Sequence, residues 1–170
     1  MSVQFVKHLF TVSMALLAVL GGRALALEAP QGPVLLTVTG NIANTNVGNE
    51  ARFDRQMLLA LTQRDTATHT PWHDGRVVFS GPLGRAVLEA VGAQGTRMRV
   101  TALNDYAATV PMADFYEHDV ILAMSADGRR LRIRDQGPLF VIYPFDEAPE
   151  LLNETVMTRS VWQVTQIDIE

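Results

Sequence analysis

Two closely spaced histidines and one serine are the first side chains in this sequence to consider for chemistry. His69 and His73 are four residues apart, a spacing that suits a shared metal only on a helix face. Pro71 lies between them and disfavours a helix, and no third ligand is obvious nearby. Ser80 lies in F-S-G-P-L rather than in the G-x-S-x-G elbow of a hydrolase. The sequence therefore gives weak support to a metal site or a serine nucleophile.

A second candidate is Asn104-Asp105-Tyr106, which follows a predicted strand. A carboxylate can accept two parallel N–H bonds, and an aromatic ring can stack on a flat heterocycle. The alternative is an Asx-turn, in which Asn104 and Asp105 bond their own backbone, and the residue types alone favour it. Trp72 and Trp162 are likewise more typical of a packed core than of a ligand platform.

Positive charge is concentrated between Asp127 and Asp146. Asp127-Gly128 is a strong turn signal, and an apolar run over Leu139–Tyr143, bounded by turn residues, predicts a buried strand. Four arginines lie between them: Arg129, Arg130, Arg132 and Arg134. Arginine suits carboxylates, phosphates and aromatic faces. The simpler interpretation is a solvated hairpin that leads into the core.

The elements that must position these residues are mostly strands. Apolar runs and alternation predict strands at Val34–Thr39, Arg76–Phe79, Arg97–Leu103, Tyr106–Val110, Val120–Met124, Leu139–Tyr143 and Trp162–Ile169. The alternation shifts phase within the last of these, which predicts a β-bulge. Short helices are expected after the capping residue Asp54 and between Gly81-Pro82 and Gly92, with a short helical or irregular stretch from Pro111. Glu147–Glu154 is expected to be an acidic, exposed connection. The sum is a β-rich α+β domain with two or three short helices.

The first 26 residues have the features of a signal peptide. Lys7 precedes an apolar stretch over Leu9–Leu20, and Ala24-Leu25-Ala26 matches a signal-peptidase site. We therefore expect residues 1–26 to be removed after Ala26 and residues 27–170 to form one periplasmic domain, with no membrane insertion after cleavage. An uncleaved anchor is the alternative, although the apolar stretch is short for a membrane span.

The composition argues against several classes of partner and excludes every site that needs cysteine. The formal net charge of −4 becomes −6 once Lys7 and Arg23 leave with the signal peptide, which argues against nucleic acid or anionic membrane as a partner. The chain contains no cysteine. Disulfides, thiolate nucleophiles and cysteine metal ligands are therefore all excluded.

Taken in order, several segments resemble a known family. They are F-S-G-P-L-G-R-A-V-L-E-A-V-G-A (79–93), A-L-N-D-Y (102–106), V-P-M-A-D (110–114), I-L-A-M-S-A-D-G-R-R-L (121–131), G-P-L-F-V-I-Y-P (137–144) and W-Q-V-T-Q-I-D-I (162–169). This set is similar to the small exported proteins related to the molybdopterin-binding domain of sulfite oxidase. The resemblance covers nearly the whole chain after the signal peptide and implies a mixed, β-rich α+β fold that holds a pterin cofactor.

One departure from that family bears on activity. Catalytic members hold molybdenum through a cysteine, and the corresponding stretch here is Thr68-His69-Thr70-Pro71-Trp72. Without a thiolate, soft ligation of the metal is impossible. Some small members resemble instead periplasmic regulators, which bind a reduced pterin without molybdenum and act on the periplasmic part of a membrane-bound cyclic-di-GMP enzyme.

The resemblance implies a set of cofactor-binding residues. Asp105 is expected to accept paired N–H groups of the pterin, with Asn104 as a second polar contact and Trp72 or Tyr106 stacking on the ring. Arg132 or Arg134 is expected to reach the pterin carbonyl, a side-chain hydroxyl or a phosphate. His69 and Thr70 are expected beside the position of the missing metal.

The resemblance, together with the missing cysteine, implies a non-enzymatic, periplasmic pterin-binding sensor that acts on an inner-membrane signalling protein. We expect a reduced pterin rather than molybdopterin, and no molybdenum. The alternative from another class is a molybdopterin-dependent oxidoreductase, or a degenerate relative, with a non-cysteine metal ligand. A third interpretation is an interaction module with an empty pocket.

Overall fold

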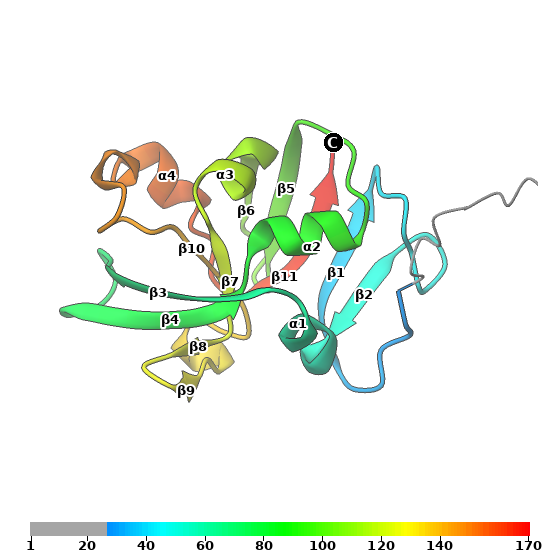
Figure 1. Ribbon diagram of the computed structural model, residues 1–170, viewed down its shortest axis with the longest axis horizontal. Coiled ribbons are helices and arrows are strands. Elements are labelled where there is room, and N and C mark those ends of the chain that lie inside the picture. The colour runs from blue at the N-terminus through cyan, green and yellow to red at the C-terminus, as the bar shows by residue number, and fades with distance from the viewer. Residues whose placement is uncertain (1–26) are drawn as a thin grey trace, which may run out of the picture.

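The computed structural model describes residues 27–170 (Figure 1). The predicted signal peptide and its cleavage site lie outside these residues. No helix within them is long and apolar enough to cross a membrane.

A five-stranded mixed sheet forms the larger part of the fold, and Figure 1 shows α2 (Gly84–Ala90) crossing one of its faces. Its strands, in spatial order, are β2 (Ala51–Asp54), β1 (Val34–Gly40), β11 (Val164–Ile169), β5 (Arg97–Ala102) and β6 (Ala107–Pro111). Only β1 and β11 pair in parallel. The pairing of β11 with β5 shifts register between Val164 and Gln166, which confirms the predicted bulge.

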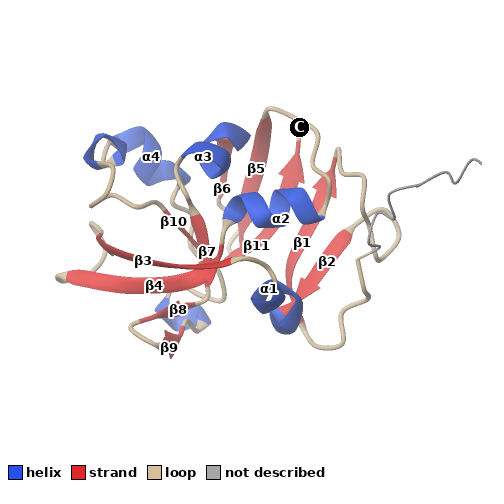
Figure 2. Ribbon diagram, in the orientation of Figure 1, coloured by secondary structure: helices blue, strands red, loops and turns tan. Residues whose placement is uncertain are grey.

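A long hairpin extends away from this sheet, as Figure 2 shows. It consists of β3 (Gln63–His69) and β4 (Arg76–Pro82), and it continues through β8 (Ser125–Ala126) to the edge strand β9 (Arg129–Arg130). A separate antiparallel pair is formed by β7 (Ile121–Ala123) and β10 (Phe140–Ile142). The turn at residues 70–75, at the end of the hairpin, carries three of the side chains considered for chemistry, Thr70, Trp72 and His73.

Strand β4 passes very close to β7 at Gly81. A Cβ atom at this position would lie 2.1 Å from the carbonyl oxygen of Leu122. The backbone of Ser80 also accepts a 2.8 Å hydrogen bond from the amide of Met124. Only glycine fits this crossing, because the neighbouring atom is backbone and cannot rotate away.

The helices are short. The α-helices are α1 (Arg55–Ala60), α2, α3 (Met112–Glu117) and α4 (Glu154–Arg159), and the 3₁₀ turns are η1 (Ile133–Asp135) and η2 (Pro149–Leu151). The expected helices at Asp54, Gly81-Pro82 and Pro111 are present, and Gly92 has a φ of +59° after α2. The sequence predicted an acidic, exposed connection over Glu147–Glu154 and no helix after it, so it missed α4. Asn153 starts this helix, because its side chain accepts a hydrogen bond from the amide of Val156.

The helix cap at Asp54 gives a pH-dependent prediction. Its carboxylate accepts hydrogen bonds from the amides of Met57, Gly32 and Gln31, and the Met57 amide contributes most to holding its pKa below the ordinary 3.8. A lowered folded-state pKa stabilises the fold above pH 3.8, and this contribution is lost as the pH falls through the folded pKa.

We therefore expect Asp54→Asn to lower stability near neutrality, because an amide has a single acceptor oxygen for the amides of Met57, Gly32 and Gln31. Its stability should also fall less steeply than that of the wild type below about pH 4, so that the two proteins converge in acid. Urea unfolding measured across this pH range is the test. Asp65→Asn, at an exposed position of β3, is the control. Parallel pH profiles for Asp54→Asn and the wild type would contradict the prediction.

Two hydrophobic clusters meet beside the hairpin turn. The larger fills the space between the five-stranded sheet and its helices, and the smaller lies around Phe79 and Phe140. Trp72 packs against both clusters. The turn at residues 70–75 is thereby fixed on the body of the protein.

Candidate functional site

Three hollows surround the turn between β3 and β4, and the predicted site residues are distributed among them. We name these the aromatic cavity, the histidine hollow and the arginine groove. Their volumes are about 610, 620 and 1040 Å³. Cavities of a few hundred to 1,000 Å³ are typical of small-molecule sites.

The aromatic cavity brings together Trp72, Asn104 and Tyr106, three of the eight predicted residues. It is formed by the hairpin turn, the turn between β5 and β6, and α4 with the residues after it. The lining residues are Trp72, Ala102, Asn104, Tyr106, Glu154, Met157, Thr158, Ser160, Val161 and Trp162. Aromatic and aliphatic walls with a few polar groups are the usual composition of a pocket for a flat organic ligand.

The tryptophans of this cavity are held by ring contacts. The centroid of Trp72 lies 5.6 Å from that of Phe140 and 5.9 Å from that of Trp162. Trp162 is 38% exposed, and Trp72 is half-buried. The core therefore supports one side of these rings and leaves part of their surface accessible for stacking.

The polar groups of the cavity are fixed by the backbone. The hydroxyl of Tyr106 donates a 3.0 Å hydrogen bond to the carbonyl of Thr158, which joins the β5–β6 turn to α4. The side-chain oxygen of Asn104 accepts a 3.2 Å hydrogen bond from the amide of Tyr106. Asn104 thus makes the Asx-turn that the residue types favoured, and it also lines the cavity.

An ion pair fixes the helix that closes this cavity. Arg159, the last residue of α4, donates a 3.0 Å hydrogen bond to Asp114 of α3. The same carboxylate oxygen accepts a 2.7 Å hydrogen bond from the hydroxyl of Tyr143. Burial raises the pKa of Tyr143, and the neighbouring Asp114 adds to this, so the tyrosine stays neutral and donates.

The histidine hollow holds His69 and Thr70 and lies beside Asp146. The ring Nδ1 of His69 is 2.9 Å from a carboxylate oxygen of Asp146, and the His69 amide donates to the other oxygen at 3.0 Å. This amide, followed by the imidazole, holds the pKa of Asp146 below its ordinary value. Thr70 contacts the ring Nδ1 of His73 at 2.8 Å. Within residues 27–170, no three His, Cys, Asp or Glu side chains are grouped to hold a metal.

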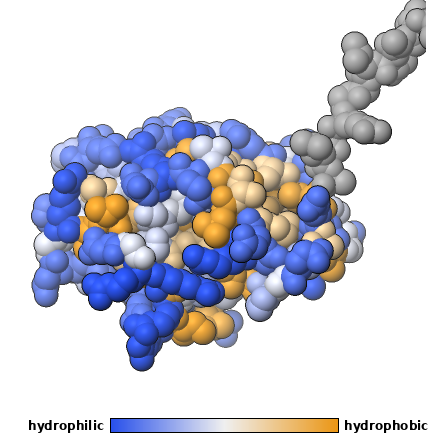
Figure 3. All heavy atoms as spheres, turned by 60° about the horizontal axis from the view of Figure 1, so that its bottom comes forward, coloured by the Kyte–Doolittle hydropathy of each residue, from blue (hydrophilic) through white to orange (hydrophobic). Residues whose placement is uncertain are grey.

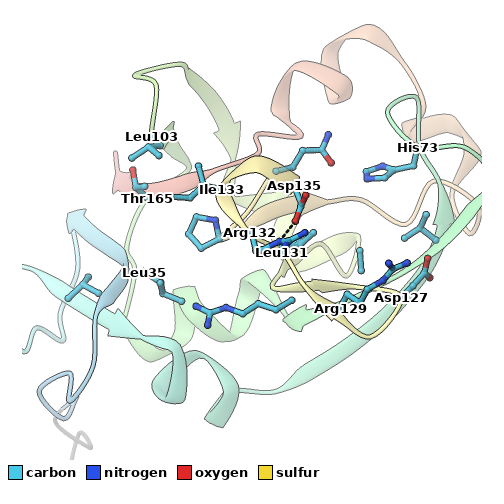
Figure 4. A pocket seen from close by; sticks show the side chains of 16 residues that line it. Leu35, His73, Leu103, Asp127, Arg129, Leu131, Arg132, Ile133, Asp135 and Thr165 are labelled. Carbon is cyan, nitrogen blue, oxygen red and sulfur yellow. Dashed lines mark hydrogen bonds and ion pairs between the residues drawn. The ribbon is translucent and has the colours of Figure 1, made fainter.

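The arginine groove contains Arg132 and lies between the β8–β9 hairpin, η1 and the lower end of the five-stranded sheet. Figure 4 shows Leu103, Ile133 and Thr165 grouped at one end and Asp127 with Arg129 at the other. Arg132 forms an ion pair with Asp135. Arg134 does not line the three hollows, and its guanidinium lies 3.8 Å from Asp135.

Asp105 also lies outside the linings of the three hollows. It occupies the tip of the β5–β6 turn with a φ of +65°, and its side chain is exposed. The carboxylate that does line the aromatic cavity is Glu154. Sequence reasoning placed Glu154 in a connection and preferred a core role for Trp162, so it named neither as a site residue. The W-Q-V-T segment, one of the family-like motifs, was the signal that pointed to Trp162.

Comparison with known proteins agrees with the fold. The family model described as "Oxidoreductase molybdopterin binding domain" matches residues 37–147. Curated proteins gave no match. Among solved structures, the sulfane dehydrogenase SoxCD from Paracoccus pantotrophus superposes with a TM-score of 0.59 at 18% sequence identity, over 79% of this chain. The chain spans 37% of the length of that SoxCD chain, so the likeness concerns the fold. The predicted sulfite oxidase-like α+β fold is confirmed.

Proposed function

The chain belongs to the family of oxidoreductase molybdopterin-binding domains, and from this premise we propose that it binds a pterin in the aromatic cavity and acts as a sensor without redox chemistry of its own. The observation that carries the proposal is the pairing of Trp72 and Tyr106 with polar groups in one cavity of about 610 Å³. A pterin is a flat bicycle with hydrogen-bonding edges, which matches walls of this composition.

The side chains of the aromatic cavity fit the pterin ring of a molybdopterin cofactor better than they fit its molybdenum. Molybdenum in this family is held by a thiolate, and the chain has no cysteine. The residues that would hold the pterin are Trp72 and Tyr106 by stacking, and Asn104 and Glu154 by hydrogen bonding. A simple reduced pterin therefore suits this chain better than molybdopterin with molybdenum.

One observation favours a second candidate, an oxidoreductase with a non-cysteine ligand. The Nδ1 of His69 faces Asp146 at 2.9 Å, an arrangement that leaves Nε2 as the free ring nitrogen. Histidines that bind metals are commonly oriented by a carboxylate in this way. A lone histidine is nevertheless a sparse ligand set for a metal. Bound molybdenum in the purified protein would favour this candidate.

We also propose that the protein is exported to the periplasm and reports on pterin to the periplasmic part of an inner-membrane signalling protein. The support for export is the signal-peptide pattern of residues 1–26. The support for a cyclic-di-GMP signalling partner is the resemblance to small exported regulators that lack the cysteine.

Intrinsic fluorescence offers a direct test of pterin binding. The chain has two tryptophans, Trp72 and Trp162, and both line the aromatic cavity. Titration with a dihydropterin or tetrahydropterin is expected to quench the emission of both, with saturation at one equivalent. A protein that keeps its emission unchanged up to millimolar pterin would refute the proposed site.

Glu154 gives a sharper prediction within the same titration. Its carboxylate can accept the paired N–H groups of the pterin, and hydrogen bonds to charged groups contribute about 1.5–3 kcal/mol. We expect Glu154→Gln to weaken pterin binding by about tenfold or more. Glu150→Gln, in the neighbouring η2 and outside the lining, is the matched control. If Asp105→Asn weakens binding and Glu154→Gln does not, the original assignment of Asp105 holds instead.

A further inference from the structure

We propose that the arginine groove is a docking site for an acidic, extended segment of another protein. The groove is a separate hollow from the aromatic cavity, with a volume of about 1040 Å³. It lies on the face that Figure 3 brings forward, where hydrophobic surface lies directly beside strongly hydrophilic side chains. Its charge, its exposed apolar side chains and its free strand edge each favour an acidic, extended protein segment.

The groove keeps an excess of positive charge, because three arginines line it (Arg129, Arg130 and Arg132) against two carboxylates (Asp127 and Asp135). Arg129 and Arg130 are exposed and make no ion pair in residues 27–170, while Arg132 pairs with Asp135. Asp127 at the other end accepts a hydrogen bond from the amide of Val78, which fixes its position but leaves its negative charge in place. Because the whole chain has a formal net charge of −4, this groove is a local site of opposite sign that attracts an acidic group.

Apolar side chains lie within reach of the same arginines. Ile133 is 57% exposed and Leu103 is 53% exposed, and both line the groove together with Leu35 and Pro138. Large exposed apolar side chains gathered in a hollow mark an interaction surface. A partner segment that fits this groove would therefore carry apolar residues between its acidic residues.

The shape favours a protein segment over a small anion. At about 1040 Å³ the groove lies at the upper end of the range of small-molecule pockets and is far larger than a small anion needs. Strand β9 is the edge of the four-stranded sheet and carries Arg129 and Arg130 itself. An extended segment can hydrogen-bond to such an edge while its side chains alternate between the arginines and the apolar wall.

The groove shares a wall with the aromatic cavity. His73 and Leu103 line the groove, and their chain neighbours Trp72 and Asn104 line the cavity. Gln163, which follows Trp162, accepts from the Leu103 amide at 2.9 Å and donates to the Gln136 and Ile133 carbonyls on the groove side. A partner docked in the groove would therefore contact residues that are next to those around a bound pterin. This part of the inference rests on the proposed function.

The test uses a short fluorescein-labelled peptide in which Asp and Glu alternate with Leu, measured by fluorescence anisotropy with the protein of residues 27–170. We expect saturable binding that weakens as salt increases. The double variant Arg129→Glu/Arg130→Glu is expected to lose at least about thirtyfold in affinity, since like charges then face the peptide. Arg99→Glu, at an exposed position of β5 outside the groove, is the matched control and should bind as the wild type does.

Three outcomes would overturn the proposal. Equal binding by the wild type and the double variant would place the peptide elsewhere. Equal binding of the same peptide with Asn and Gln in place of Asp and Glu would remove the role of charge. Self-association in sedimentation that the double variant abolishes, without peptide binding, would assign the groove to a second copy of this chain. Pterin titration of the same variants, without peptide, tests the proposed function separately and confirms that each variant is folded.

Discussion

Replacing Trp72 by Leu is expected to weaken pterin binding by about tenfold to a hundredfold. Leu keeps an apolar side chain against Phe140 but removes the aromatic face that lines the cavity. Stacking of a flat heterocycle on an aromatic side chain contributes about 1–3 kcal/mol, and each 1.4 kcal/mol is a factor of ten in affinity.

Trp72→Phe is the matched variant, because it keeps an aromatic ring of smaller size. It is expected to retain most of the affinity, and near-ultraviolet circular dichroism of both variants checks that the core around Phe140 is intact. Quenching of the remaining Trp162, which also lines the cavity, provides the binding signal in both variants. If Leu and Phe at this position lower the affinity equally, burial rather than stacking explains the role of Trp72.

Replacing Gly81 by Ala is expected to give the largest loss of stability among the substitutions considered. The added methyl group would lie 2.1 Å from the carbonyl oxygen of Leu122, so β4 and β7 would have to separate. Overpacking usually costs about 1–3 kcal/mol, and we expect about 3 kcal/mol or more here because the obstacle is backbone.

Urea unfolding at neutral pH measures this effect, with Gly32→Ala as the control. A Cβ atom at Gly32 would meet the side chain of Asp54 at 3.7 Å, an ordinary contact. Gly32→Ala is therefore expected to be nearly neutral. Equal stabilities of the two variants would show that β4 moves away from β7 at little cost.

The sequence predicted most strands because their burial follows a simple alternation. Met98 and Val100 are buried while Arg97 and Arg99 are exposed, as the pattern required. The Asp54 cap was also predicted from local sequence, because Asp is a preferred capping residue before a helix. Helix α4 was not predicted, because E-T-V-M-T-R contains β-branched residues and no helical apolar period. Its position depends on tertiary contacts, which include the ion pair of Arg159 with Asp114, the hydrogen bond from Tyr106 to Thr158 and the burial of Val156.

The candidate site was predicted only in part. Trp72 and Tyr106, the two aromatic residues predicted for the site, line one cavity although they are separated in the sequence. His69 and Arg132 lie in two other hollows, since the turn at residues 70–75 has a different hollow on each of its sides. Which hollow a residue faces is decided by strand register and by α4, and local residue types do not report either. The binding roles of all eight predicted residues remain predictions for the titrations described above.

The most direct test of the pterin-sensor account is the ligand that the protein carries when it is made in its own host and purified without added pterin. Acid extraction followed by mass spectrometry identifies the pterin, and elemental analysis of the same sample quantifies molybdenum. The account predicts a simple pterin at about one equivalent and no molybdenum. Molybdopterin with stoichiometric molybdenum would contradict it and identify the protein as an oxidoreductase.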